Sequence, residues 1–331
     1  MYMQSNNNYI WLLIDDRKGN SSQVYGVAKY INSDKIIEKK IFYNNLALLP
    51  NIFLSKNIPH IKIKYKKQFK PPWPKLVIGC GRRSTPLGLW IKKQSNNYSK
   101  FVQIMWPGYP YKKIDLIFTP EHDKITNKKN VINIFSSPNI IDKNLLKNYY
   151  LEWEKKLQYL SSPKIAVLIG GDTKKHKLKP NHIIKLMSSI KLIIDKNKGS
   201  LLITTSRRTS TECLKTIEQE IKKLSIQSEL WTPYKNTNNP YFGFLAHSDL
   251  IIVTGDSISL CSEASATGKP ILIFAPKDIT VAKHKNFHNL LIKNNIAMDI
   301  NKFHINNIKN LNYKPINEAS NIAKIITKKL L

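Results

Sequence analysis

The sequence predicts an α/β protein of two domains, each built around a parallel β-sheet. Apolar runs at residues 250–253 and 271–274 enclose a helical stretch at 258–267 that ends at Gly268, which is the pattern of a strand, a crossover helix and a parallel strand. The chain has 331 residues, too many for one ordinary α/β core, and 42% of them are hydrophobic, which is enough for two cores.

The boundary between the domains is expected at Ser161-Ser162-Pro163, because a long helix at 142–160 ends there and a second series of strands begins. The N-terminal domain would then be residues 1–160. The C-terminal domain would be residues 161–331. The last helix, expected at 317–331, is a candidate to cross back to the first domain.

The remaining elements follow from apolar runs bounded by turn residues. In the first domain we expect strands at 9–14, 35–43, 61–70, 75–78, 101–105, 115–119 and 130–135, and helices at 22–31 and from 86. In the second we also expect strands at 165–169, 200–205 and 229–231, and helices from about 180, at 210–224 and at 241–246. Open α/β sheets bind ligands at the carboxyl ends of their strands, so the candidate sites are sought there.

The stretch at 61–70 alternates apolar residues and lysines before a rigid run of prolines around Trp73. An edge strand protected by lysines explains this pattern, and we expect one. The alternative is a basic, aromatic patch that rests on a membrane surface, with Tyr65, Phe69 and Trp73 at the level of the headgroups.

The formal net charge of +31 invites a nucleic-acid hypothesis. Lys, Asn and Ile are abundant together, however, and an AT-rich genome produces that composition without selection for binding. We therefore expect no specific nucleic-acid partner, and we keep an anionic membrane surface as a candidate partner. The sequence points to no protein partner.

Cys80, Cys213 and Cys261 are odd in number and widely spaced, which indicates a reducing compartment and no structural zinc. The start of the chain lacks the basic region of a signal peptide, and its apolar run at 9–14 stops at Asp15-Asp16. No run reaches the length of a membrane span. We expect a cytoplasmic protein, with the inner face of the cytoplasmic membrane as a candidate peripheral site.

The helical stretch at 258–267 carries the first candidate site. Ser257 and Ser259 are good cap residues at its start, where unpaired amides and the helix dipole suit a phosphate. Glu263 lies four residues beyond Ser259 on the same face, within reach of sugar hydroxyls beside that phosphate. The alternative is that small residues here only allow close packing and that Glu263 is a solvated charge.

Other strand ends in the second half carry similar chemistry. Gly170-Gly171-Asp172 follows one strand, and glycines let a ligand approach the backbone. Ser206-Arg207-Arg208 follows another and supplies cations for a phosphate. Trp231-Thr232 lies where a base could stack. Their agreement predicts a nucleotide diphosphate site in the second domain.

The first half offers weaker candidates. Asp16 follows the first strand and could act as a general base, although Asp15 and Asp16 are also common turn residues. Arg82 and Arg83 suit an anionic group on a substrate, against the alternative of solvated arginines. His122 lies in a titratable run that surface turns often produce.

A nicotinamide cofactor is not expected. Gly79-Cys80-Gly81 is only part of a dinucleotide fingerprint, because Ser84 replaces the third glycine and Gln103 stands where an acidic ribose ligand is expected. We expect no cofactor beyond the nucleotide diphosphate sugar as substrate, and no metal.

Together these motifs resemble the bacterial branch of the elongated-mitochondria, or mitochondrial fission, family. The resemblance covers nearly the whole chain and rests on Asp16-Arg17-x-Gly19-Asn20-x-x-Gln23, Gly81-Arg82-Arg83-Ser84, Pro120-Glu121-His122-Asp123, Gly170-Gly171-Asp172, Thr204-Thr205-Ser206-Arg207-Arg208 and Thr254-Gly255-Asp256-Ser257-x-Ser259-x-x-x-Glu263-Ala264.

That family resembles two-domain GT-B glycosyltransferases, which implies two Rossmann-like domains facing each other across a cleft. The 257–263 segment looks like the donor-binding segment of the muramyl-pathway N-acetylglucosaminyltransferase and the Kdo transferases. By that likeness Glu263 binds ribose, and the helix start at Ser257 and Ser259 binds the donor diphosphate. The same likeness implies that residues 1–160 form the acceptor side and residues 161–331 the donor side. The chain departs from the family at Trp106, where the family has Asp, which argues against a catalytic acid at that position.

The leading hypothesis is a metal-independent glycosyltransferase that moves a sugar from a nucleotide diphosphate to a cell-envelope acceptor. The residues expected to bind the donor are Gly170, Gly171, Asp172, Ser206, Ser257, Ser259 and Glu263. The residues expected to take part in catalysis are Asp16, Arg207 and Arg208. The residues expected at an acceptor or anion site are Arg17, Asn20, Gln23, Arg82, Arg83 and His122. The alternative is a non-catalytic scaffold, as the plant member is understood to recruit a dynamin-like GTPase at the mitochondrial surface.

A sugar-nucleotide epimerase needs a Tyr-x-x-x-Lys pair on a helix. Only Tyr25 and Lys29 have that spacing, and they lie upstream of any cofactor glycine loop. The sequence therefore disfavours this class.

Overall fold

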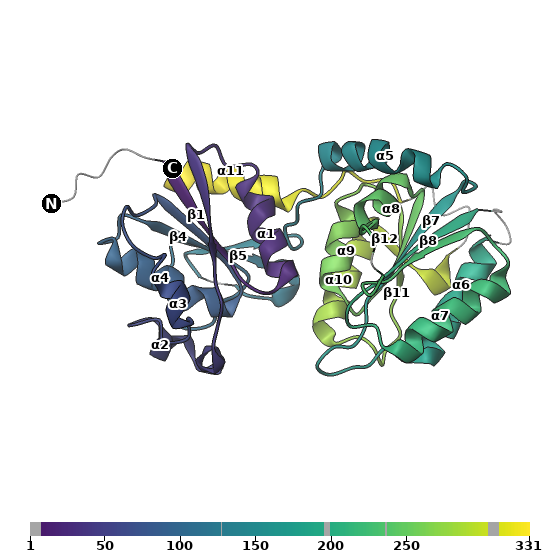
Figure 1. The fold of residues 1–331 in the computed structure, drawn as a ribbon, viewed down its shortest axis with the longest axis horizontal. Coiled ribbons are helices and arrows are strands. Elements are labelled where there is room, and N and C mark those ends of the chain that lie inside the picture. Colours follow the sequence, from purple (N-terminus) through teal and green to yellow (C-terminus); the bar gives the residue numbers. More distant parts are fainter. Residues whose placement is uncertain (1–7, 127, 195–198, 236, 304–310) are drawn as a thin grey trace. The chain divides into compact units, whose positions relative to one another are not determined.

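The computed structural model describes residues 8–126, 128–194, 199–235, 237–303 and 311–331. The chain forms two compact units (Figure 1). Unit 1 contains Met1–Ile140 and Asn317–Leu331, and unit 2 contains Ile141–Ile316. Each unit has one six-stranded sheet whose paired strands are all parallel, which confirms the predicted α/β class with parallel sheets.

The sheet of unit 1 has the order β2-β1-β3-β4-β5-β6. The strands are β1 (Tyr9–Ile14), β2 (Lys35–Lys40), β3 (Leu76–Cys80), β4 (Lys100–Ile104), β5 (Leu116–Pro120) and β6 (Val131–Ile134). The chain first runs from β1 outward to β2 and then returns to β3 on the other side of β1. The strand order therefore reverses between β1 and β3, and such a switch point leaves a crevice at the carboxyl ends of the two strands.

Helices cover both faces of this sheet. They are α1 (Lys18–Ala28), α2 (Asn51–Leu54), α3 (Ile63–Lys66), α4 (Thr85–Gln94) and α11 (Glu318–Leu330), with 3-10 turns η1 (Asn45–Leu48), η2 (Arg82–Ser84) and η3 (Glu121–Asp123). Leu12 of β1 packs in one core cluster with α1 and α11, whereas Trp11 packs in another with α4. Successive strand residues point to opposite faces, so both faces of β1 are buried.

The sheet of unit 2 has the order β12-β11-β10-β7-β8-β9. The strands are β7 (Lys164–Ile169), β8 (Ser200–Thr205), β9 (Ser228–Trp231), β10 (Leu250–Thr254), β11 (Ile271–Phe274) and β12 (Ala297–Asp299). This is the strand order of a doubly wound nucleotide-binding sheet, and it reverses between β7 and β10.

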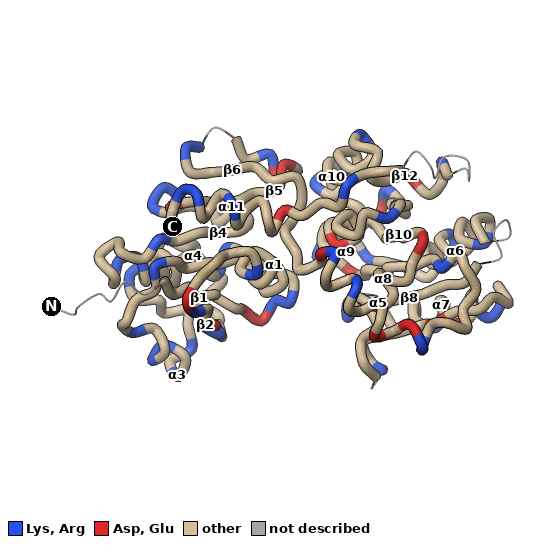
Figure 2. Tube along the Cα trace, turned by 90° about the horizontal axis from the view of Figure 1, so that it is seen from above, with Lys and Arg blue, Asp and Glu red and all other residues tan. Residues whose placement is uncertain are grey.

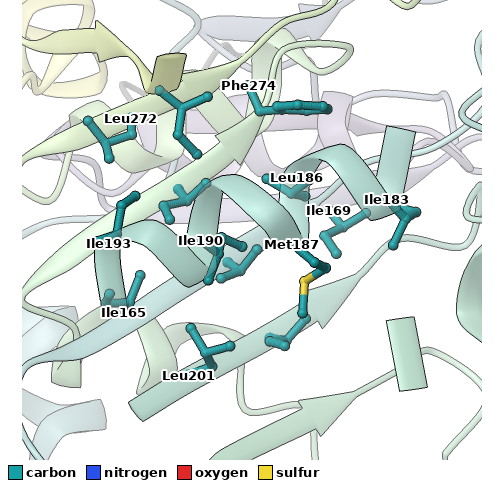
Figure 3. Close-up of a cluster of buried hydrophobic side chains, with 14 of the residues drawn as sticks. Ile165, Ile169, Ile183, Leu186, Met187, Ile190, Ile193, Leu201, Leu272 and Phe274 are labelled. Carbon is teal, nitrogen blue, oxygen red and sulfur yellow. The ribbon is translucent and has the colours of Figure 1, made fainter. Parts of the chain in front are cut away.

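The helices of unit 2 are α5 (Lys143–Leu157), α6 (Pro180–Ile194), α7 (Thr211–Leu224), α8 (Tyr241–His247), α9 (Ile258–Ser265) and α10 (Ala282–Lys293), with the 3-10 turn η4 (Ile300–Lys302). Figure 3 shows α6 lying on the sheet, with Leu186, Met187 and Ile190 packed toward β7, β8 and β11. On the opposite face Trp153 of α5 and Phe244 of α8 cover Leu202.

The domain boundary differs from the expected division at 160 and 161. Helix α5 belongs to unit 2, because Trp153 and Leu157 are buried against Leu202 and Phe244 of that unit. The polar run at Ser161-Ser162-Pro163 is therefore a turn inside unit 2. The predicted return of the last helix is confirmed, since α11 belongs to unit 1.

The expected edge strand at 61–70 is wrong. Residues 63–66 form α3, and the segment touches a neighbour as a strand only at the single antiparallel bridge between Tyr43 and Ile61. The alternation misleads because Ile61 and Phe69 are buried while Ile63, between them, is 81% exposed. The apolar residues thus do not share one face, as an edge strand requires.

Smaller differences concern the ends of elements. Helix α1 begins at Lys18, four residues before the expected start, so Asn20 is helical rather than part of a loop. Elements α10, β12, η1 and α2 were not predicted. All three cysteines are buried free thiols. Within the described residues, no helix is long and apolar enough to cross a membrane.

The packing of α11 predicts that unit 1 depends on the last residues of the chain. Ile322 is fully buried against the sheet of unit 1, so Ile322→Ala should lower the free energy of unfolding of this unit by about 2–5 kcal/mol. Hydrogen exchange measured by mass spectrometry should show faster exchange in β1 and β3 and unchanged exchange in β7 and β10. The control Lys324→Ala, at an exposed position of the same helix, should change neither; equal effects of both variants would contradict the assignment.

Candidate functional site

The loops after β7, β8 and β10 meet at the switch point of unit 2. The Gly170 amide donates to Thr254 Oγ1 at 2.8 Å, which ties the end of β7 to the end of β10. The Gly170 carbonyl accepts from Ser206 Oγ at 3.0 Å and from Thr209 Oγ1 at 2.5 Å, which ties it to the loop after β8. Three of the four strand ends that the sequence singled out, those after β7, β8 and β10, are therefore joined along one edge.

Asp256 is the buried centre of this edge, with 4% of the residue exposed. Its Oδ2 accepts from the Gly171 amide at 2.9 Å and from the Arg208 guanidinium at 3.3 Å. Its Oδ1 has no hydrogen-bond partner among the residues that the structure describes. A carboxylate removed from water needs such partners, so Asp256 fixes the positions of the other two loops.

The two glycines are required by this packing. A Cβ atom on Gly170 would lie 2.1 Å from Asp256 Oδ2, and one on Gly171 would lie 2.3 Å from the backbone of Arg208. The sequence suggested that these glycines let a ligand approach. In the structure, the groups that approach them are the chain's own carboxylate and backbone.

The two arginines predicted to neutralise a diphosphate differ in their surroundings. Arg208 donates to the carbonyls of Gly171 at 3.2 Å and Asp172 at 2.8 Å, in addition to Asp256. Arg207 is exposed and forms no ion pair with a described residue. Arg207 is therefore the arginine that a ligand can recruit without disturbing the loops.

Asp172 and Ser206 also hold the edge in place. Asp172 Oδ1 accepts from the Leu178 amide at 3.0 Å and so closes the loop that leads to α6. Ser206 Oγ accepts from the Arg208 amide at 3.0 Å, while it donates to Gly170. Both were predicted donor-binding residues, and both have structural contacts that a ligand would share.

Helix α9 begins at this edge, as predicted. Ser257 is its N-cap and accepts from the Leu260 amide at 3.4 Å, and Ser259 is exposed in the first turn. Glu263 lies one turn further on and is partly buried. Its carboxyl accepts a hydrogen bond from the Tyr241 hydroxyl. Burial raises the pKa of Glu263 to about 7, and the bond from Tyr241 lowers it only in part.

Tyr241 was not predicted as a site residue. It lies at the start of α8, 22 residues before Glu263, and burial beside that carboxyl raises the pKa of its hydroxyl. Nothing in the spacing of the two residues indicates their contact, because it depends on how α8 packs beside α9.

His284 was also missed. It lies in the first turn of α10, within the electrostatic reach of Asp256, Arg208 and His176, and burial lowers the pKa of its imidazole. Its Nδ1 has no hydrogen-bond partner among the described residues. No local pattern indicated this residue, because α10 itself was not predicted.

Trp231, predicted to stack on a base, lines a cavity of about 700 Å³ between β9, α5 and α8. Trp153 and Phe244 form other walls of it. The indole Nε1 atoms of both tryptophans have no hydrogen-bond partner among the described residues. Thr232, the residue after β9, is buried. The stacking role stays a prediction.

Unit 1 has its own polar cluster at its switch point. Asp15, directly after β1, is buried and accepts from the Arg17 amide and from Asn20 Nδ2, both at 3.0 Å. Arg83, directly after β3, donates to Asp15 at 3.2 Å and also pairs with Asp16. Its guanidinium lies 4.5 Å from the ring centre of Tyr43.

A shallow hollow of about 470 Å³ lies beside this cluster, and its lining includes Asp15 and Asp16 of the loop after β1 and Ser21 and Tyr25 of α1. The structure thus brings Arg17, Asn20 and Arg83, predicted for an acceptor or anion site, together with Asp16, the predicted base. The side chain of Asp16 is 58% exposed, and its carboxylate forms an ion pair with Arg83.

The other three predicted residues have different surroundings. Arg82 donates to the carbonyls of Ala47 and Leu49 and to Asn51 Oδ1, at 2.6, 2.7 and 3.2 Å, so it anchors the η1 and α2 segment. Gln23 is buried and its Nε2 lies 3.7 Å from Met105 Sδ. His122 is buried in η3, with its Nε2 3.9 Å from Asp123.

No cluster of three or more His, Cys, Asp or Glu side chains that could hold a metal ion occurs within the described part of the chain. Each unit therefore has its own candidate site of amides, hydroxyls, carboxylates and arginines at its switch point.

Two parallel sheets with helices on both faces define the GT-B class of folds, and solved structures of that class share the fold. MurG of Acinetobacter baumannii aligns with a TM-score of 0.54 at 13% identity, over 97% of this chain and 99% of its own. The UDP-GlcNAc 2-epimerase of Methanocaldococcus jannaschii aligns with a TM-score of 0.55 at 13% identity, over the same shares. At such identities the likeness shows the fold alone.

The chain belongs to the family described as mitochondrial fission ELM1, whose profile matches residues 18–330. Protein RP120 of Rickettsia prowazekii (strain Madrid E) is 34% identical over 96% of this chain and 97% of its own. Mitochondrial fission protein ELM1 of Arabidopsis thaliana is 25% identical over 80% of this chain and 66% of its own. The family resemblance drawn from the motifs is confirmed.

The contacts of the two arginines predict a large loss of stability for one substitution and almost none for the other. Arg208→Met removes the partner of Asp256 and leaves two carbonyls unbonded, so it should lower the free energy of unfolding of unit 2 by about 1–3 kcal/mol. Arg207→Met, at the exposed neighbouring position, should change it by less than about 0.5 kcal/mol. Denaturant unfolding of both variants measures the difference, and a loss as large for Arg207→Met would refute the division of roles.

The raised pKa of Glu263 predicts a pH-dependent stability. The folded chain holds this proton up to about pH 7, whereas the unfolded chain releases it near the ordinary value of 4.5, so the free energy of unfolding falls as the pH rises through that window. The cost is on the order of 1–3 kcal/mol once the pH exceeds 7. Glu263→Gln, compared with wild type in denaturant at pH 5 and pH 8, should lose this part of the pH dependence; parallel pH profiles would exclude it.

Proposed function

We propose that unit 2 binds a nucleotide diphosphate sugar and that the protein transfers the sugar to a cell-envelope acceptor. The observation that carries this proposal is the position of α9 at the switch point between β7 and β10, with Ser257 capping it and Glu263 one turn inside. Free amides in the first turn of a helix attract phosphate, and a carboxylate beside them suits ribose hydroxyls. A structural neighbour is the UDP-GlcNAc 2-epimerase of Neisseria meningitidis bound to UDP-GlcNAc, with a TM-score of 0.54.

In this proposal the diphosphate takes the start of α9, and Arg207 approaches it from the loop after β8. An acceptor hydroxyl attacks the anomeric carbon of the sugar, the bond from that carbon to the diphosphate oxygen breaks, and the hydroxyl proton passes to a base. Negative charge then grows on the departing diphosphate. A cation that is free to move onto it stabilises the transition state more than the bound donor.

Asp16 is the proposed base, on unit 1. Its carboxylate is exposed at the switch point of that unit, but it is paired with Arg83. A base must accept a proton, so this ion pair has to open or shift when the acceptor binds. Such a protein would work at the cytoplasmic face of the cytoplasmic membrane, where nucleotide sugars and envelope acceptors meet.

The same ion pair favours a second candidate function. With Asp16 held by Arg83 and Trp106 in place of the family's Asp, the chain lacks an unpaired carboxylate at this position, which suits a scaffold that binds a nucleotide without turnover. The fold alone does not separate a transferase from an epimerase, because MurG and the epimerases share it. An epimerase is disfavoured because the Tyr25 and Lys29 pair lies upstream of any cofactor glycine loop.

Titration calorimetry against a panel of nucleotide diphosphate sugars tests donor binding. Glu263→Ala should weaken the best ligand on the order of ten- to a hundredfold, because it removes a charge-assisted hydrogen bond to the sugar. Glu218→Ala, at an exposed position of α7, is the matched control and should bind as wild type does. Equal affinity of the two folded variants would exclude Glu263 from the site, and no binding by wild type would overturn the nucleotide proposal.

Turnover separates the enzyme from the scaffold. Arg207→Met should lower the release of nucleotide diphosphate on the order of a hundredfold, with a smaller loss of donor affinity. Lys222→Met, exposed on α7, is the control for lost positive charge. If wild type binds a donor but releases no product with a membrane extract as acceptor, the scaffold is the function.

A further inference from the structure

The segment between β2 and β3 of unit 1 exposes large apolar side chains. Leu48 of η1 is 83% exposed, Phe53 of α2 is 69% exposed and Ile63 of α3 is 81% exposed. We call these three residues, with Leu46, Leu49 and Ile52, the apolar patch; the latter three are 43–47% exposed. Single exposed apolar residues are normal, whereas six in three consecutive short helical turns are a candidate interaction surface.

The backbone that carries this patch is firmly held. Asn44, the cap of η1, donates from its side chain to the Pro59 carbonyl at 2.9 Å and so joins η1 to the segment that leads into α3. Asn51 of α2 donates to the Pro107 carbonyl at 3.0 Å and is buried. Arg82 binds the carbonyls of the same segment. Hydrogen bonds therefore fix the backbone of this segment, while its apolar side chains remain exposed instead of packing in the core.

Positive charge surrounds the patch. Lys56, Lys62, Lys64 and Lys67 are exposed in the same segment, and Figure 2 shows basic residues gathered around α3. The sequence has no Asp or Glu between Glu38 and Asp115. A compositional bias toward lysine does not by itself remove every acid from so long a stretch.

We infer that this face of unit 1 docks on an anionic lipid bilayer, with Leu48, Phe53 and Ile63 inserted among the acyl chains and the lysines at the phosphates. Apolar side chains favour the bilayer interior and flanking lysines favour a negatively charged surface, so the two contributions add. Nucleic acid would use the lysines but leave the aliphatic side chains in water. The inference is independent of the proposed transferase activity, because it uses none of the site residues of unit 2.

Flotation of the full chain with vesicles tests this docking. Wild type should float with vesicles of phosphatidylcholine and phosphatidylglycerol at low salt, and much less with phosphatidylcholine alone or at high salt. Lys62→Gln/Lys64→Gln/Lys67→Gln should weaken partitioning on the order of a hundredfold, since each lysine near such a surface contributes about fivefold. Leu48→Ser/Phe53→Ser should weaken it by at least about tenfold even at low salt.

Matched controls lie in unit 2. Leu151→Ser/Leu192→Ser removes two apolar side chains of similar exposure, and Lys215→Gln/Lys222→Gln removes exposed lysines of α7. Both should float as wild type does. The inference is overturned if wild type fails to float with anionic vesicles at low salt, or if the patch variants and the controls float alike.

Size-exclusion chromatography without lipid identifies the main competing occupant. A monomeric wild type agrees with docking on lipid. A dimer that Leu48→Ser/Phe53→Ser dissociates would instead assign the patch to a second copy of the chain and overturn the lipid inference.

Discussion

The buried carboxylate of Asp256 is the constraint on which the ligand edge of unit 2 depends. It lies between three strand ends and takes a hydrogen bond from the Gly171 amide and an ion pair from Arg208. Its oxygens fill the space beside Gly170, and the backbone of Arg208 fills the space beside Gly171, so neither glycine position tolerates a side chain. A buried charge without partners is costly, so the loops are held in the arrangement that pairs Asp256 with Gly171 and Arg208. What remains for a ligand is the outer layer: Arg207 and the first turn of α9.

Unit 1 repeats this design with different residues. Asp15 is the buried carboxylate, and it orders the start of α1 through Asn20 and the loop after β3 through Arg83. Its neighbour Asp16 stays exposed, as Arg207 does beside Arg208. In both units, an inner charged residue holds the switch point together and an adjacent exposed one faces solvent. The structural role of Asp15 and Arg208 follows from these contacts, whereas the functional roles of Asp16 and Arg207 stay predictions.

Sequence reasoning predicted what depends on local pattern, such as the strand, helix and strand around α9, since apolar runs, a cap and a glycine stop are local signals. It failed at 61–70, because the apolar residues Ile61 and Phe69 are buried while Ile63 between them is exposed. It also placed α5 in the wrong domain, because only the contacts of Trp153 show which core that helix joins. Glu263 was predicted as a ligand-binding residue from its place one turn after Ser259, and that role stays a prediction. Its bond from Tyr241 was not predicted, because the two residues lie far apart in the chain. A sequence indicates which side chains reach an edge of a sheet. It does not indicate which of these side chains form hydrogen bonds or ion pairs with one another. Those contacts determine which side chains remain available for a ligand.

Two adjacent arginines in unit 1 connect the patch with the switch point. Arg82 holds the backbone of η1 and α2, which carry the apolar patch, and Arg83 holds Asp15 and Asp16. Both lie in η2, a single 3-10 turn directly after β3. A bilayer that fixes η1 and α2 therefore also fixes the turn on which the pairing of Asp16 depends. An acceptor that is itself held in the membrane would reach unit 1 beside that turn, and the Asp16 and Arg83 ion pair is the group it would have to displace. Asp16 can therefore act as the proposed base only if this ion pair opens when the acceptor binds.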